Sequence, residues 1–95
     1  MKINNLIAAA KSGNEDMVRF FIDTGADPNI QDEDGSTALI YAAERGHKNI
    51  VQLLLNNGAN VNTQSRDGLT ALKIATQKGH ESISELLRAA SNQEF

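Results

Sequence analysis

A 33-residue period runs through the chain and constrains its fold more than any other feature. The segment 35–39 (Gly-Ser-Thr-Ala-Leu) returns at 68–72 as Gly-Leu-Thr-Ala-Leu. At the same offset, the segment 45–47 (Arg-Gly-His) returns at 78–80 as Lys-Gly-His. A fixed period of this length is typical of stacked two-helix units, each of which buries its apolar face against its neighbours.

The period divides the 95 residues into three units, at about 1–33, 34–66 and 67–95. Each unit is predicted to begin with a short helix. Thr37 and Thr70 stand directly before two of these helices, where a hydroxyl can accept from unpaired backbone N–H groups. Each first helix is expected to end at a glycine, which tolerates the left-handed backbone there: Gly13, Gly46 and Gly79.

A second helix follows in each unit, because apolar residues recur there at spacings of three and four. We expect these residues to share one buried side of the helix: Met17, Val18, Phe20 and Phe21; Ile50, Val51, Leu53 and Leu54; Ile83, Leu86 and Leu87. The stretches 27–35 and 60–68, which link successive units, are rich in turn formers. They predict hairpin-like loops, called fingers below, that project from the helices.

The pattern resembles the ankyrin repeat family. The family's G-x-T-P-L-H segment corresponds to residues 35–40 and 68–73, its A-A-x-x-G-H segment to 42–47, and its L-L-L-x-x-G-A-D-V-N segment to 53–62. The chain departs from the family pattern where Pro, His and a finger Asp are usual: Ala38 and Ala71, Ile40 and Lys73, and Ser65. These departures leave the register intact. The resemblance implies an all-α solenoid of three stacked helix-turn-helix units with finger loops.

The two ends of the array are predicted to be capped by polar residues. Ser84 and Arg88 take the places that Val51 and Leu55 hold in the middle unit, on the helix face that would otherwise cover a fourth repeat. Solenoids need such polar terminal faces to stay soluble. At the other end the polar positions are Lys2, Asn5 and Lys11. Three units are therefore expected to be a complete array.

Composition and charge argue against several classes of function. The net charge of -3 lacks the basic footprint of a protein that binds nucleic acid. There is no cysteine, so disulfides and thiolate metal sites are excluded. The apolar run at residues 6–10 is shorter than a secretory apolar region. We expect a cytoplasmic monomer that does not enter a membrane.

Candidate metal and catalytic residues are few, and each has a structural interpretation. His47 and His80 occupy equivalent places in adjacent units, where packed helices lie about 8–10 Å apart, too far for one shared zinc ion. A histidine that bonds the backbone between repeats is favoured instead. The acidic run 32–35 does not fit a calcium-binding EF-hand, because Ile30 and Tyr41 would be its first and twelfth residues. With no nucleophile signature and no phosphate loop, we expect neither catalysis nor a cofactor.

The resemblance implies a protein–protein interaction module in which the finger tips and the first-helix ends select the partner. Leu69 holds the finger position of Ser36 and is expected to face solvent, either as a partner contact or as an ordinary exposed leucine. The predicted partner-binding residues are Lys11, Glu33, Asp34, Ser36, Glu44, Arg45, Arg66, Asp67, Leu69, Gln77 and Lys78.

Two other hypotheses remain at this stage. The chain could be purely structural, as a minimal or designed repeat array, or it could be a fragment of a larger protein that carries the activity elsewhere. It could also be a substrate, since residues 54–62 resemble ankyrin segments that are hydroxylated on the finger asparagine, here Asn62, although Asn60 replaces the preferred acid.

Overall fold

The computed structural model describes residues 5–92, and within that range it contains six helices and no strand. The helices are α1 (Asn5–Ser12), α2 (Glu15–Asp23), α3 (Ala38–Arg45), α4 (Lys48–Asn56), α5 (Ala71–Gln77) and α6 (Glu81–Asn92). They form three successive helix pairs, so the predicted all-α repeat stack is confirmed.

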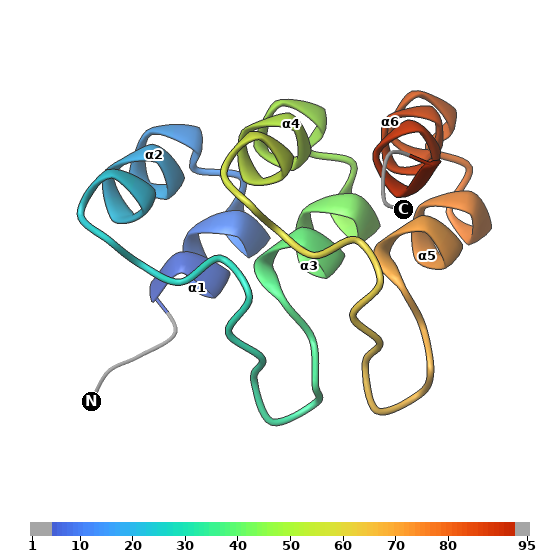
Figure 1. Ribbon diagram of the computed structural model, residues 1–95, viewed down its shortest axis with the longest axis horizontal. Coiled ribbons are helices and arrows are strands. Elements are labelled where there is room, and N and C mark those ends of the chain that lie inside the picture. Colours follow the sequence, from blue (N-terminus) through green and yellow to red (C-terminus); the bar gives the residue numbers. More distant parts are fainter. Residues whose placement is uncertain (1–4, 93–95) are drawn as a thin grey trace.

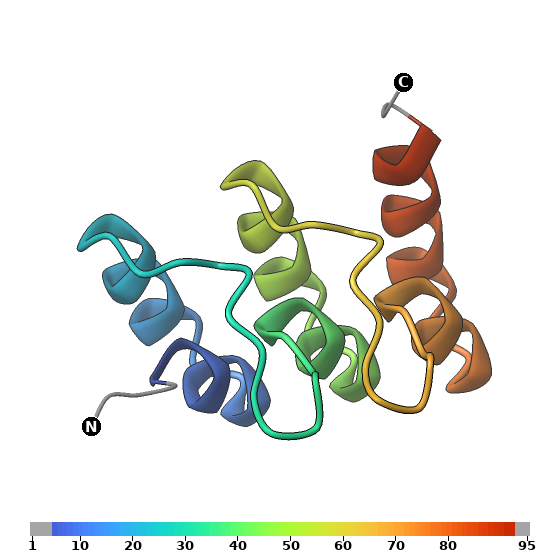
Figure 2. The same ribbon diagram turned by 60° about the horizontal axis from the view of Figure 1, so that its bottom comes forward.

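The helices are arranged in two rows (Figure 1). Helices α1, α3 and α5 pack side by side in one row, and α2, α4 and α6 form the second row, which lies above the first in this view. In the structure each finger is one residue longer than predicted: the first comprises residues 27–36 and the second residues 60–69. Both extend beyond the first row of helices (Figure 2).

The predicted helix starts are confirmed at Thr37 and Thr70. Their hydroxyl oxygens accept the backbone N–H groups of Ile40 and Lys73, each at 3.2 Å. Gly46, which follows α3, has a φ of 80°. A Cβ atom there would lie 3.0 Å from the His80 ring, so both the left-handed backbone and the close approach favour glycine.

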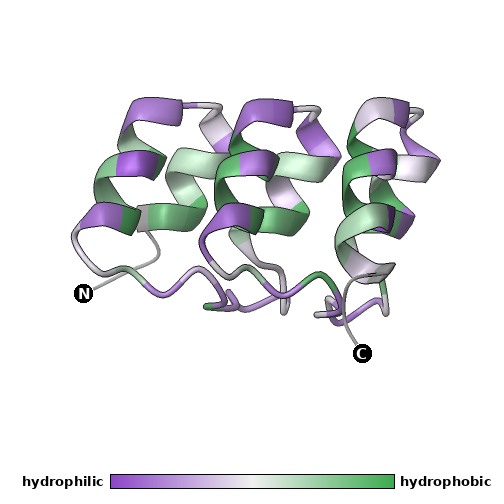
Figure 3. Cartoon of the chain, turned by 45° about the horizontal axis from the view of Figure 1, so that its top comes forward, coloured by the Kyte–Doolittle hydropathy of each residue, from purple (hydrophilic) through white to green (hydrophobic). Residues whose placement is uncertain are grey.

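The core consists of aliphatic residues packed between the helices. In Figure 3, hydrophobic residues (green) lie mainly on the helix sides that face other helices, and hydrophilic residues (purple) lie on the outer sides. Its largest fully buried members include Leu39, Ile50, Leu54 and Leu87. Burying a side chain of this size contributes about 1.5–3 kcal/mol relative to leaving it in water. The longest described helix has 12 residues, and no described helix is long and apolar enough to cross a membrane.

The outer side of α2 differs from the prediction. Met17 and Phe20 were expected on the buried side, but they are 38% and 55% exposed, whereas Val18 is buried. Ile50, which corresponds to Met17 in the next repeat, is buried because α4 lies between α2 and α6. Among the described helices, α2 has a second-row neighbour on one side only. The periodicity identified the apolar positions, but burial also requires a neighbouring repeat.

The outer side of α6 is also only partly as predicted. Arg88 is exposed, but Ser84 is buried, with 5% of its surface accessible. The hydroxyl groups of Ser84 and Thr76 share a hydrogen bond of 3.1 Å, which links α6 to α5. Ser84 is therefore a satisfied polar contact inside the last repeat. Of the polar residues predicted for the other end, Lys2 and the side chain of Asn5 lie outside the described part.

Candidate protein-interaction surface

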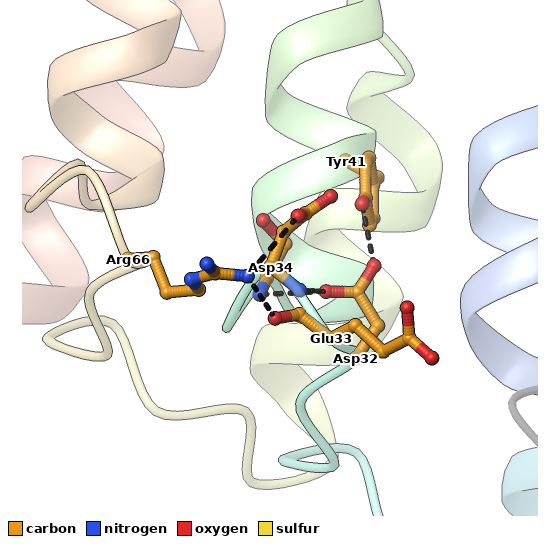
Figure 4. A network of polar contacts seen from close by, with 6 residues as sticks. Asp32, Glu33, Asp34, Tyr41 and Arg66 are labelled. Carbon is orange, nitrogen blue, oxygen red and sulfur yellow. Dashed lines mark hydrogen bonds and ion pairs between the residues drawn. The ribbon is translucent and has the colours of Figure 1, made fainter.

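The tip of the first finger is closed by its own backbone and tied to α3 by one carboxylate. The Gly35 N–H donates to the Asp32 carbonyl, and the Asp32 N–H donates to the Ser36 carbonyl, both at 2.9 Å. The Asp32 carboxylate accepts the N–H groups of Asp34 (2.9 Å) and Ser36 (3.0 Å). It also accepts the Tyr41 hydroxyl at 2.5 Å (Figure 4). Asp32 thus fixes the tip against the helix row.

The surroundings of Asp32 keep its carboxylate charged. Burial alone would raise the pKa of Asp32, but the hydrogen bonds from Tyr41 and the finger backbone, with the nearby charge of Lys11, together hold it below the ordinary value of 3.8. The hydrogen bond to Asp32, followed by burial, raises the pKa of Tyr41, so its hydroxyl remains a donor. The Lys11 Nζ lies 4.8 Å from the centre of the Tyr41 ring, within range of a cation–π contact.

The second finger has the same backbone turn with a weaker anchor. The Gly68 N–H donates to the Ser65 carbonyl and the Ser65 N–H to the Leu69 carbonyl, both at 2.9 Å. The Ser65 hydroxyl accepts the Leu69 N–H at 3.3 Å. Because Ser65 and Ile74 stand where the first finger uses Asp32 and Tyr41, the second finger has no equivalent tie to α5.

The two fingers are joined to each other along their length. The Arg66 N–H donates to the Asp34 carbonyl at 2.8 Å, and Arg66 Nη1 donates to the Glu33 carbonyl at 2.9 Å. Arg66 Nη1 also lies 3.9 Å from a carboxylate oxygen of Asp34 (Figure 4). Nearer the helices, the Asn60 N–H donates to the Asn29 side-chain oxygen at 2.7 Å. The fingers therefore form one continuous wall facing the first row of helices.

A hollow of about 400 Å³ lies between α1, the first finger and the end of α3. Its apolar part comes from Ile7 and Ala8, and its charged side chains are Lys11, Arg45 and Asp32. We call it the first hollow; its lining residues are Ile7, Ala8, Lys11, Ser12, Asp32 and Arg45.

A second hollow of about 480 Å³ lies between the two fingers, α3 and α5. Its charged residues are Asp34, Glu44, Arg66 and Asp67. Its apolar and aromatic residues are Ile40, Tyr41, Leu69 and Ile74, and Ser36 and Ser65 complete the lining. The two hollows adjoin at Tyr41, whose ring lines the second hollow and lies beneath Lys11 of the first.

The structure brings most of the predicted partner-binding residues to these two hollows. Lys11 and Arg45 line the first hollow, and six others line the second: Asp34, Ser36, Glu44, Arg66, Asp67 and Leu69. Glu33, Gln77 and Lys78 are exposed but line neither.

Two of the predicted residues lie differently from the prediction. Leu69 was expected to face solvent, but it is half-buried and packs against the hydrophobic core. Ser36 was predicted as a partner-binding residue of the finger, but it is buried; its N–H donates to the Asp32 carboxylate, and its carbonyl accepts the Asp32 N–H. Leu69 and Ser36 therefore belong to the floor of the second hollow.

Sequence reasoning missed Asp32 and Tyr41, which organise the surface. Asp32 was considered only as part of the acidic run 32–35, and Tyr41 stands at a position that is Ile74 in the next repeat. A signal was available, since Ser65 was recognised as a departure where a finger Asp is usual. The corresponding residue in the first finger is Asp32. Its hydrogen-bond partner, Tyr41, lies nine positions further along the chain, and the 33-residue period does not predict this pairing.

The structural interpretation of the histidines is confirmed for His80. Its Nε2 lies 3.1 Å from the Glu44 carbonyl oxygen of the preceding repeat, which bonds adjacent repeats. The His47 ring lies close to Gly13, as the His80 ring lies close to Gly46, since a Cβ on Gly13 would lie 2.7 Å from it. Within residues 5–92, no group of three or more His, Cys, Asp or Glu side chains is arranged to hold a metal ion.

The family model described as ankyrin repeats (3 copies) matches residues 6–94. The chain belongs to the ankyrin repeat family. Ankyrin repeats are generally protein-interaction modules and are typically not catalytic. A comparison with curated proteins found no match.

Proposed function

We propose that this ankyrin repeat protein binds a protein partner in the groove between its fingers and its first row of helices, without catalysing a reaction. The observation that carries the proposal is the pair of adjoining hollows, which combine apolar floors with charged rims. Solenoids commonly bind through such extended concave surfaces. The wall of the groove is held in place by hydrogen bonds between the fingers, so little ordering is needed when a partner binds.

The proposal includes a monomer located in the cytoplasm. Nucleic acid is not the proposed partner, because the net charge of -3 would repel a phosphate backbone.

The experiment compares the groove with the opposite side of the molecule. A photo-crosslinking amino acid is placed at Arg45, which is exposed beside the first hollow, or at Gln52, which is exposed in the middle of α4 on the second row. After irradiation in the source cell, quantitative mass spectrometry should find a protein attached through position 45 and not through position 52. A partner captured only through position 52 would assign binding to the convex side, and no partner at either position would favour the purely structural role.

The charged rims give a second check on any captured partner. Charge reversal at Arg45 should slow association and weaken its dependence on salt, because rim charges act mainly on the rate of encounter. The same change at Arg88 should leave association unchanged, since that exposed residue lies on α6, in the second row of the last repeat.

A further inference from the structure

The two hollows carry opposite charge. The charged residues that line the first hollow are two cations, Lys11 and Arg45, and one anion, Asp32. Both oxygens of the Asp32 carboxylate are already engaged, one by two finger N–H groups and the other by Tyr41. Within the described residues 5–92, neither Lys11 nor Arg45 forms an ion pair. With two cations against one carboxylate, the first hollow carries a net positive charge.

The second hollow presents the reverse. Asp34, Glu44 and Asp67 line it, against Arg66 as the single cation in its lining. The Arg66 guanidinium is already occupied, since Nη1 donates to the Glu33 carbonyl and lies 3.9 Å from Asp34. This leaves the carboxylates of Glu44 and Asp67 to interact with a ligand, next to the apolar residues that line the same hollow.

The change of sign occurs within two adjacent residues of α3. Glu44 lines the second hollow and Arg45 lines the first. Tyr41, one turn earlier on the same helix, stands between the hollows and is held by its hydrogen bond to Asp32. The boundary between the two charges is thus built on a rigid element.

We propose that the groove selects an extended peptide segment that places an acidic side chain in the first hollow and a basic side chain in the second. This inference rests on the proposed function and names the class of partner. Complementary charges of this kind determine which partner binds and in which register.

The spacing of the two side chains follows from the geometry of the stack. The hollows are one repeat apart, and neighbouring packed helices lie about 8–10 Å from each other. An extended chain in the polyproline II conformation advances about 3.1 Å per residue and brings its side chains back to the same side at every third residue. The acidic and basic residues should therefore be about three positions apart, and the residue between them nearest the second hollow should be apolar to cover Ile40 and Leu69.

The first experiment is a selection without bias toward charge. The purified full chain is used to select from a display library of random peptides of roughly 12 residues. In extended form such peptides can span the 32 Å long dimension of the molecule. The enriched peptides should contain an acid and a base two to four positions apart more often than the unselected library does.

The second experiment assigns each charge to its hollow by double-mutant cycles. In one enriched peptide, the acid is changed to its amide and the base to methionine, separately. The affinity of each changed peptide is measured for the parent protein and for the variants Arg45→Gln and Glu44→Gln, with Arg88→Gln on α6 as the control on the second row. Removing the peptide acid should weaken binding by about three- to fivefold for the parent and Glu44→Gln, but by less than about 1.5-fold for Arg45→Gln. Removing the peptide base should show the converse pattern.

The outcomes separate this inference from the proposed function. Enriched peptides that lack the acid–base pair, or equal losses with every protein variant, would overturn the charge assignment while leaving a peptide-binding module. No enrichment above the unselected library would overturn both. Melting curves of the variants should match the parent, because the substituted side chains are not part of the core, so a change in binding reports on the groove.

Discussion

The first and second fingers share one backbone turn but are anchored differently. In the first, the Asp32 carboxylate accepts three hydrogen bonds, including one from Tyr41 on α3. In the second, the Ser65 hydroxyl accepts one, from within the same finger. The first finger is also covered on one side by the second, through the backbone of Arg66. Two fingers with the same backbone turn are thus constrained to different degrees, depending on the contacts that each makes with other parts of the molecule.

The largest difference between the fingers is expected for alanine at the turn glycines. Gly35 and Gly68 have φ values of 75° and 79°, so alanine costs about 1–2 kcal/mol at either position. A Cβ on Gly35 would also lie 3.0 Å from the Arg66 backbone nitrogen, whereas a Cβ on Gly68 meets nothing within 4 Å. Such crowding adds about 1–3 kcal/mol. Urea denaturation should rank Gly35→Ala clearly below Gly68→Ala in stability, and equal losses would show that the fingers do not press on each other.

A smaller and pH-dependent difference is expected between Asp32→Asn and Ser65→Ala. Because the pKa of Asp32 is lowered in the folded protein, its stabilising contribution is complete above its ordinary pKa and is lost as the pH falls through the lowered value. At about pH 7, Asp32→Asn should lower the free energy of unfolding by about 1 kcal/mol, and this deficit should shrink below about pH 4.

The matched variant in the second finger is the control for that pH profile. Ser65→Ala removes an uncharged acceptor, so its deficit relative to the parent should be the same at about pH 7 and about pH 3. If both variants kept a constant deficit across this range, Asp32 would not be the titrating anchor of the first finger.

The smallest effect is expected for the side chain of Arg66. The guanidinium is well exposed where it meets Asp34, and exposed ion pairs contribute about 0–1 kcal/mol. Arg66→Gln should change the free energy of unfolding by less than about 0.5 kcal/mol, because the backbone N–H that joins the fingers is retained. A loss as large as that of Gly35→Ala would mean that the side chain, rather than the backbone, holds the fingers together.

Much of the fold could be predicted because its determinants repeat. The threonines before α3 and α5 and the glycines after the first-row helices lie at one fixed offset, and each acts through its local backbone. Most of the predicted partner-binding residues also line the two hollows, since the period places equivalent residues in one row. Their role in binding remains a prediction.

The wrong predictions concern residues whose neighbours in space differ from those of the equivalent residues in the other repeats. Met17 and Phe20 are at positions that are apolar in every repeat, yet they are exposed because α2 lacks a second-row neighbour on that side among the described helices. Ser84 was expected on an open face and instead bonds Thr76 within its own repeat. Asn62 is exposed, and its N–H donates to the side-chain oxygen of Asn60. Hydroxylation of Asn62 remains a hypothesis.

The sequence by itself determined the all-α repeat stack, its register and the location of the fingers, because these follow from local propensities and from a period that recurs along the chain. Only the tertiary structure decided which apolar positions are buried, that Asp32 and Tyr41 anchor the first finger, and that opposite charges line adjacent hollows. These features depend on side chains that meet across different repeats. Burial and charge pairing depend on which elements pack together, and this cannot be read from the order of residues along one element.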